Sequence, residues 1–379
     1  MGATENKKID SGDELRTVAI MPWLHLKSVV TCFGVKFTVY ERNNPPDEYR
    51  IYKNQIDRIL SSYRNLEGEQ ISECVLLSLR GADPCQNLNE SELNQIKIAI
   101  EVLAFCALSK NMFFSQVRHY TNRTFFDFYF QRFLIKEYQD LAIRVRRRDG
   151  SLINGGFEHG KVLFSVPIQC SLQQRYKIDE NLLLALEKVK SPQMRRIKQS
   201  IMLFNQANTD SDSIMTDREI VLLASAYEQL FDDCFGADDL ACKVSTLMDG
   251  YGSRKVGESD RKKLIKIKKP EEKEWHLNRK WMQELYHLRN TYTHGNDPSE
   301  RTWGWSVLEH LVMATFFFPR IVKMLLAQQS LYVLSKEDKK ELYCIDNLLE
   351  LKEWAKKSKE NNNTSNWENV LQQASWDYA

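Results

Sequence analysis

The sequence predicts an α+β protein, in which an N-terminal mixed α/β domain is followed by a C-terminal all-α helical bundle. A length of 379 residues corresponds to two domains at ~100–200 residues each. Runs rich in β-branched and aromatic residues lie in the first half, whereas after residue 173 apolar residues recur mainly at helical spacing. These observations place an α+β domain at residues 1–175, a helical domain at 176–334 and a charged tail, partly helical or mobile, at 335–379.

The first half contains candidate strands at residues 29–40, 125–135, 141–145 and 161–166. Between the first two runs, residues 90–108 place apolar side chains at i, i+3, i+7 and i+10, which predicts a helix. Glycine pairs and Asp-Gly near residues 149–156 mark turns toward the end of this half.

The second half predicts a series of amphipathic helices. The predicted helical ranges are 179–189, 194–205, 240–248, 273–290 and 299–331. A further helix follows Thr216, the expected N-cap, with Glu219 as its capping-box partner, and ends at Gly236. A connector rich in lysine and arginine, residues 254–269, precedes Pro270.

The composition is that of an ordinary soluble protein, with 42% hydrophobic and 27% charged residues. The 53 basic side chains nearly balance 51 acidic ones, so any nucleic-acid contact must come from a local patch. The 8 cysteines form no C-x-x-C pair, and neither an export signal nor a ~20-residue apolar span occurs. We therefore expect a cytoplasmic protein without a membrane partner.

Several motifs that hold cofactors or metals are absent from the sequence. Neither G-x-G-x-x-G nor the P-loop pattern occurs, and there is no G-x-S-x-G or H-E-x-x-H. We expect no cofactor and no metal site.

One short segment between two amphipathic helices concentrates reactive groups. Residues 288–295 read L-R-N-T-Y-T-H-G, and Gly295 predicts that the helix ends near Thr293. In a continuous helix Arg289 and His294 would point ~140° apart, so we expect a loosened last turn that brings both to one pocket.

This pair suits cleavage of a phosphodiester by the neighbouring 2′-hydroxyl. Imidazole exchanges protons near neutral pH, and arginine offers a planar fork of donors to phosphate oxygens. The alternative is that Arg289 and His294 cap the helix and interact with its dipole, as in a purely structural scaffold.

The segment resembles the R-x(4–6)-H motif of HEPN domains, in which a polar residue, here Asn290, follows the arginine. Residues 224–231 are similar to the acidic helix of ApeA-like HEPN domains, and the resemblance covers about residues 217–331. It implies a homodimer that cleaves RNA without a metal at a composite site. In that reading Arg289 contacts the scissile phosphate, His294 transfers a proton or orients the 2′-hydroxyl, Asn290 holds one of them, and Glu228 supports the site.

The resemblance also implies a bacterial defence or stress effector. Its N-terminal domain would sense or bind an unidentified trigger or ligand, or restrain the helical domain. One departure is Asn296, because the toxin branch paired with nucleotidyltransferases carries tyrosine two positions after the histidine. The alternative is a catalytically silent HEPN-like module that dimerises or binds nucleotides or RNA.

The basic connector is the candidate RNA-backbone contact. Its candidate residues are Arg254, Lys255, Arg261, Lys262, Lys263 and Lys266. The alternative is a solvated loop whose charge is offset by the glutamates at positions 271, 272 and 274.

Overall fold

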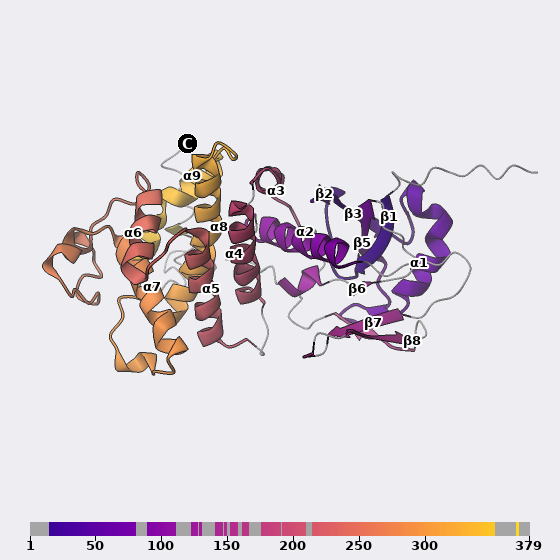
Figure 1. Cartoon of the computed structure of the whole chain (residues 1–379), viewed down its shortest axis with the longest axis horizontal. Helices are drawn as coiled ribbons and strands as arrows, with labels where there is room; N and C mark the ends of the chain where they lie inside the picture. Colours follow the sequence, from indigo (N-terminus) through magenta and orange to yellow (C-terminus); the bar gives the residue numbers. More distant parts are fainter. Residues whose placement is uncertain are drawn as a thin grey trace, which may run out of the picture. The chain divides into compact units, whose positions relative to one another are not determined.

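The computed structural model describes residues 15–80, 89–110, 123–127, 129–130, 141–146, 148–149, 152–157, 161–166, 176–190, 192–209, 214–352 and 369–370. The chain divides into two compact units (Figure 1). Unit 1 comprises Met1–Leu103 and Thr124–Lys177, and unit 2 comprises Ala104–Arg123 and Ile178–Ala379. The strands lie in unit 1 and most helices in unit 2, which confirms the expected α+β class.

Unit 1 is built on an antiparallel five-stranded sheet with the order β2-β3-β5-β1-β6. The strands are β1 (Leu15–Met21), β2 (Val30–Cys32), β3 (Val35–Glu41), β5 (Glu73–Arg80) and β6 (Tyr129–Phe130). Helix α2 (Glu90–Leu108) matches its predicted range. It attaches to the β2–β3 turn, because the Gln95 amide donates to the Phe33 carbonyl at 2.7 Å.

The predicted strand at residues 29–40 is in fact a hairpin. Phe33 and Gly34 both have positive φ, 48° and 75°, which is the backbone of a two-residue primed turn. The Gln95 amide nitrogen lies 2.7 Å from where a Cβ of residue 34 would stand. Gly34 therefore reverses the chain where residue-type propensity alone favours one continuous strand.

The remaining elements of unit 1 are short. They are η1 (Asp47–Tyr52), α1 (Lys53–Leu60), η2 (Arg123–Phe126) at the unit boundary, the parallel pair β4 (Tyr63–Arg64) and β9 (Phe164–Ser165), and the hairpin β7 (Leu141–Arg146) and β8 (Leu152–Phe157). The strand predicted at 125–135 is wrong at its start, where η2 ends, and residues 131–135 lie outside the described residues.

Unit 2 is helical. Its main helices are α3 (Glu180–Glu187), α4 (Gln193–Ala207), α5 (Thr216–Leu230), α6 (Ala237–Leu247), α7 (Leu277–Thr293), α8 (Val307–Gln328), α9 (Lys336–Tyr343) and α10 (Ile345–Glu350). Short 3-10 turns η3 (Val256–Glu258), η4 (Pro270–Glu274) and η5 (Pro298–Glu300) lie in the connections.

The core of unit 2 is aromatic. Phe318 of α8 stacks on Phe204 of α4, with ring centroids 4.6 Å apart, and meets Phe105 and Tyr227 edge-on. The buried Tyr227 hydroxyl donates to the Ala314 carbonyl at 2.8 Å. Helix α5 thereby packs on α8 with the hydroxyl of its buried tyrosine satisfied.

Several predicted helix boundaries are wrong. Helix α6 begins at Ala237 rather than residue 240, α7 begins at Leu277 rather than residue 273, and α5 ends at Leu230 rather than at Gly236. Thr216 is the first residue of α5, and the N-cap is Met215, which makes no side-chain cap. Helix α8 begins at Val307 rather than near residue 299, because Ser306 and Glu309 form a complete capping box. Pro298 instead begins the short turn η5.

Helix α8 is, within the described residues, the one helix long and apolar enough to cross a membrane, but 78% of its apolar window is buried inside the protein. The first part of the tail forms α9 and α10, in which Leu342, Ile345, Leu348 and Leu349 are buried. Residues 353–368 and 371–379, which hold the tail tryptophans, lie outside the described residues.

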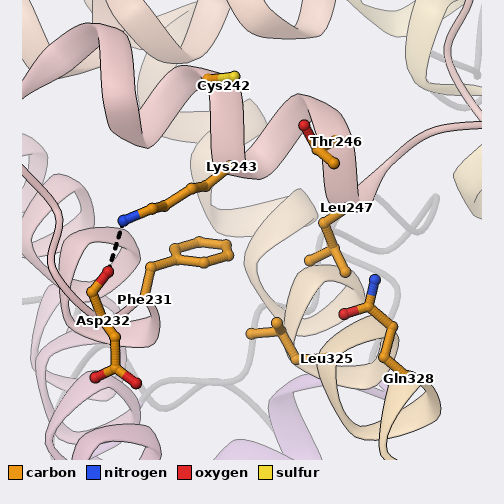
Figure 2. Close-up of a pocket in the computed structure, with 8 residues that line it drawn as sticks. All are labelled: Phe231, Asp232, Cys242, Lys243, Thr246, Leu247, Leu325 and Gln328. Carbon is orange, nitrogen blue, oxygen red and sulfur yellow. Dashed lines mark hydrogen bonds between the residues drawn. The ribbon is translucent and has the colours of Figure 1, made fainter.

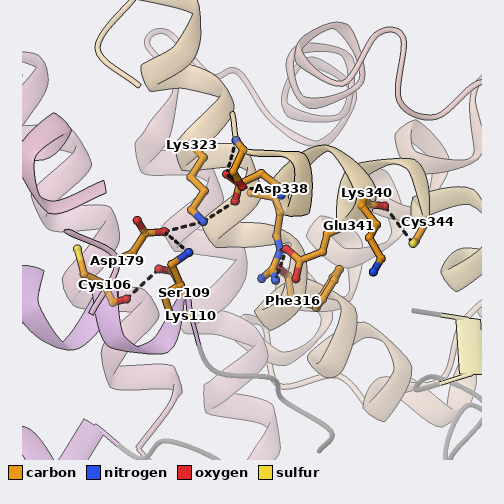
Figure 3. Close-up of polar contacts among 12 residues, drawn as sticks. Cys106, Ser109, Lys110, Asp179, Phe316, Lys323, Asp338, Lys340, Glu341 and Cys344 are labelled. Atoms are coloured by element: carbon orange, nitrogen blue, oxygen red, sulfur yellow. Dashed lines mark hydrogen bonds and ion pairs between the residues drawn. The ribbon is translucent and has the colours of Figure 1, made fainter. Parts of the chain in front are cut away.

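A buried ion cluster ties three helices of unit 2 together (Figure 3). The Lys323 ammonium of α8 lies 2.9 Å from the Asp179 carboxylate at the N-cap of α3 and 2.6 Å from that of Asp338 in α9. Asp338 also completes a capping box with Ser335 and accepts from the Tyr332 hydroxyl at 2.9 Å. The charged residues of α9 therefore attach the start of the tail to the core.

The Asp338 carboxylate makes unit 2 sensitive to acid. Burial by itself would raise the pKa of Asp338, but Lys323 and Ser335 outweigh it and lower the pKa to about 2. A carboxylate with a depressed folded pKa stabilises above its unfolded pKa and loses that contribution as pH falls. We expect ~2 kcal/mol of stability to be lost between about pH 4 and pH 2. The difference in the free energy of unfolding between wild type and Asp338→Asn, measured in urea, should become smaller as the pH falls through that range. A difference that stays constant would contradict this.

Candidate functional site

The motif segment forms the C-terminal end of α7. The Asn296 amide donates to the Thr291 carbonyl and the Gly295 amide to the Tyr292 carbonyl, at 3.0 and 3.1 Å. With Gly295 at φ 69°, these bonds form a Schellman motif. The predicted helix end at Thr293 is confirmed, and His294 is the C-cap.

Arg289 is held in a polar cluster between α7 and α5. Its guanidinium lies 3.5 Å from the Glu228 carboxylate and donates to the Asn290 side-chain oxygen at 2.9 Å. It also lies over the Tyr286 ring, whose hydroxyl donates to Glu228 at 3.2 Å. The Arg289 and Glu228 side chains are each 25% exposed, so the cluster opens to solvent.

The structure therefore brings three predicted site residues together, Arg289, Asn290 and Glu228. Tyr286 is a fourth member that the sequence analysis did not single out. Burial and then the Glu228 carboxylate raise the pKa of Tyr286, so its hydroxyl remains a donor at neutral pH. Its position one turn before Arg289 on the same helix is the signal that could have identified it.

His294 stands apart from this cluster within one chain. Its side chain is exposed, and across the described residues no hydrogen bond or ion pair joins it to Arg289. The expected loosened last turn is wrong, because the His294 amide still donates to the Asn290 carbonyl at 3.0 Å, and the chain leaves the helical conformation only at His294 itself, with φ −92° and ψ 5°. In a regular turn the positions of Arg289 and His294 lie ~140° apart around the helix.

The basic connector is an ordered segment fixed to the helices of unit 2. Arg261 is 2% exposed, pairs with Glu309 and donates to the Gly304 carbonyl at 2.8 Å. The prediction that Arg261 contacts RNA is therefore wrong, because a buried and paired guanidinium has no free surface to offer.

The other predicted RNA contacts differ in their availability. Lys255 pairs with Glu274 at 2.6 Å, and Arg254 lies 3.5 Å from Glu350. Lys262, Lys263 and Lys266 are exposed, and none of them has an ion-pair partner in the part of the chain that the structure describes.

A buried ion pair anchors the end of the connector. The Lys280 ammonium of α7 lies 2.6 Å from the Glu272 carboxylate, and both side chains are 2% exposed. Lys280 also donates to Gln283, and Glu272 accepts from the backbone amide of Lys268 at 3.1 Å. The pair fixes the backbone at Lys268 against α7.

A separate open groove of ~350 Å³ lies between the end of α5, α6 and the end of α8 (Figure 2). Its apolar floor is Phe231, Leu247 and Leu325, and the Lys243 ammonium at its rim is bound to the carbonyls of Asp232 and Asp233. It contains none of the predicted catalytic residues. Among the described residues, no group of three or more His, Cys, Asp or Glu side chains is placed to hold a metal ion.

The arrangement at the end of α7 offers an exposed imidazole and, nearby in sequence, a partly exposed guanidinium oriented by a carboxylate and an amide. Such groups can exchange a proton and bind an anion, respectively. No protein-family model, curated protein or solved structure matches the chain.

Proposed function

We propose that the chain is a metal-independent endoribonuclease of the HEPN type, with Arg289, Asn290 and His294 as catalytic residues and Glu228 as a positioning residue. The observation that carries the proposal is the orientation of Arg289, which is held by Glu228 and Asn290 yet keeps a quarter of its side chain exposed, five residues before the exposed His294. A preoriented guanidinium stabilises charge without reorganising during the reaction.

The chemistry is an attack of the ribose 2′-oxygen on the adjacent phosphorus. The O2′–P bond forms, the P–O5′ bond breaks, and the products carry a 2′,3′-cyclic phosphate and a 5′-hydroxyl. His294 takes the 2′-hydroxyl proton in its neutral form, or gives a proton to the leaving 5′-oxygen in its protonated form. Arg289 stabilises the charge on the phosphate oxygens.

Two chains are needed for this site. Within one chain the positions of Arg289 and His294 lie ~140° apart around α7, so His294 of one chain would complete a site with Arg289 of a second copy in a homodimer. In this proposal the protein acts in the cytoplasm as a bacterial defence or stress effector, and unit 1 senses a trigger or restrains unit 2.

A second candidate function is a catalytically silent HEPN-like module that dimerises or binds nucleotides or RNA. The ion pair between Arg289 and Glu228 favours it, because a guanidinium already paired with a carboxylate binds a phosphate less strongly. RNA binding without strand cleavage would identify this module.

The test is incubation of the purified chain with an RNA oligomer in EDTA, beside the same sequence made entirely of 2′-deoxynucleotides. We expect cleavage of the RNA alone, with 2′,3′-cyclic phosphate ends on the products. An intact RNA after prolonged incubation with excess dimeric protein, or equal cleavage of the DNA oligomer, would contradict the proposed function.

A further inference from the structure

The exposed lysines of the connector form a surface that differs from the one the sequence alone indicates. We define the lysine strip as Lys262, Lys263, Lys266, Lys268 and Lys269, all of which are exposed. For none of these five does an ion pair with a carboxylate occur within the described ranges. The strip therefore presents five positive charges over eight residues.

The acidic residues that follow the strip do little to neutralise it. Glu272 is buried and bound to Lys280, and Glu274 is paired with Lys255. Only Glu271 of these three glutamates is left exposed without an ion pair in the described part of the chain. Two of the three carboxylates that could balance the charge of the strip are thus paired with lysines outside it.

The strip is held in place rather than free to move as a loop. Arg261 fixes its beginning by the pair with Glu309, and the Glu272 carboxylate holds the Lys268 amide near its end. Ile265, at 4% exposure, is buried in the middle. A fixed row of ammonium groups loses less conformational entropy on binding a polyanion than a mobile tail does.

The strip meets α7 on the side of the helix that carries His294. The Lys268 ammonium lies 3.4 Å from the ring Nε2 of His287. His287 precedes His294 by seven residues, which is about two helical turns, so the two positions lie on one side of α7 and about 10 Å apart along it.

A further cation lies near the same point. Arg301 is exposed in the segment after η5. Burial first, and then the positive charges of Lys268, Lys280 and Arg301, lower the pKa of His287, although Asp238 acts in the opposite direction. The geometric contact between the strip and α7 is that of Lys268 with His287.

We propose that the lysine strip binds the sugar-phosphate backbone of RNA without reading its sequence and leads the strand along α7 to His294. The approach to His294 rests on the proposed function, whereas binding of the polyanion does not. Lysines contact phosphates as point charges and release counterions, so this binding weakens as salt increases. Leu264 is the one large apolar side chain exposed within the connector, which favours a polyanion over a lipid surface as the partner.

The test compares two fourfold variants of the full chain. The strip variant replaces Lys262, Lys263, Lys266 and Lys269 with glutamine, and the matched control replaces the exposed Lys188, Lys190, Lys336 and Lys339 in the same way. Binding of a fully 2′-O-methylated RNA oligomer, which cannot be cleaved by 2′-hydroxyl attack, is measured by fluorescence anisotropy between 50 and 300 mM salt.

We expect the strip variant to bind at least ~10-fold more weakly at 0.1 M salt, with a log–log salt slope shallower by up to ~3. The control variant should bind like wild type. Equal binding by the strip variant and wild type would overturn the inference, as would stronger, strip-dependent binding to vesicles containing phosphatidylserine than to the oligomer.

The cleavage readout separates this inference from the proposed function. If wild type cleaves RNA and the strip variant binds normally, the function stands and the strip inference falls. If wild type binds through the strip but cleaves nothing, polyanion binding stands and the nuclease falls. If wild type both cleaves RNA and binds it through the strip, Lys268→Gln should raise the KM for RNA several-fold and leave kcat within twofold. An equal effect of this substitution on KM and kcat would contradict a role in binding alone.

Discussion

His294→Ala and Arg289→Ala are each expected to lower the single-turnover rate of RNA cleavage by about two to three orders of magnitude. Loss of a positioned acid or base costs ~10²–10⁴-fold, and loss of one donor to developing negative charge costs ~10²–10³-fold. Arg289→Lys should recover only part of the rate, because lysine keeps the charge but loses the planar fork. The rates are measured with excess protein in EDTA.

Matched controls separate chemistry from folding. His276 lies at the N-cap of the same helix without a side-chain capping bond, and Arg218 is exposed in the first turn of α5. Alanine at either control position should leave the rate within about twofold of wild type. If Arg289 and His294 only cap α7, His294→Ala would instead lower the melting temperature and leave every RNA measurement unchanged.

Breaking the buried Lys280–Glu272 pair is expected to have the largest effect on stability. Lys280→Met leaves the Glu272 carboxylate without its partner, and Glu272→Gln leaves the Lys280 ammonium without its partner. Both side chains are only 2% exposed. Removal of one member of a buried pair costs ~3–5 kcal/mol, because the remaining charge is uncompensated. The free energy of unfolding in urea measures each loss.

The double variant gives a sharper result than either single one. Lys280→Met combined with Glu272→Gln removes both charges, so its loss of stability should be smaller than the sum of the two single losses by at least ~1 kcal/mol. Lys273→Gln, an exposed change in the same 3-10 turn, should cost less than ~0.5 kcal/mol. Additive losses in the double variant would show that the two side chains do not interact.

The sequence predicted those elements whose patterns are local. The spacing of apolar residues predicted α2 with correct bounds, and Gly295 predicted the end of α7. The prediction from sequence failed where a capping side chain or a positive φ angle decides the boundary of an element. Residues 299–306 contain no α-helix because Ser306 and Glu309 begin α8 later, and the β2–β3 hairpin depends on positive φ at Phe33 and Gly34.

The candidate site was predictable in its residues but not in its arrangement. The motif indicated Arg289, Asn290 and Glu228, which the structure brings together, but periodicity gives no sign that Arg289 turns toward α5. Burial of Arg261 was likewise not predictable, because it depends on Glu309, which is 48 residues further along the chain. A charge count treats all lysines and arginines of the connector as equivalent, whereas the fold buries one and pairs two others.

The most direct test of the central claim uses an oligomer of deoxynucleotides that contains one ribonucleotide, incubated with the wild-type chain in EDTA. Attack by a 2′-hydroxyl predicts a single cut on the 3′ side of that ribonucleotide, leaving a 2′,3′-cyclic phosphate, and no cut after His294→Ala. A cut elsewhere, a product ending in a 3′-hydroxyl, or the same cut in the His294→Ala variant would show that this chain does not cleave RNA in the way proposed.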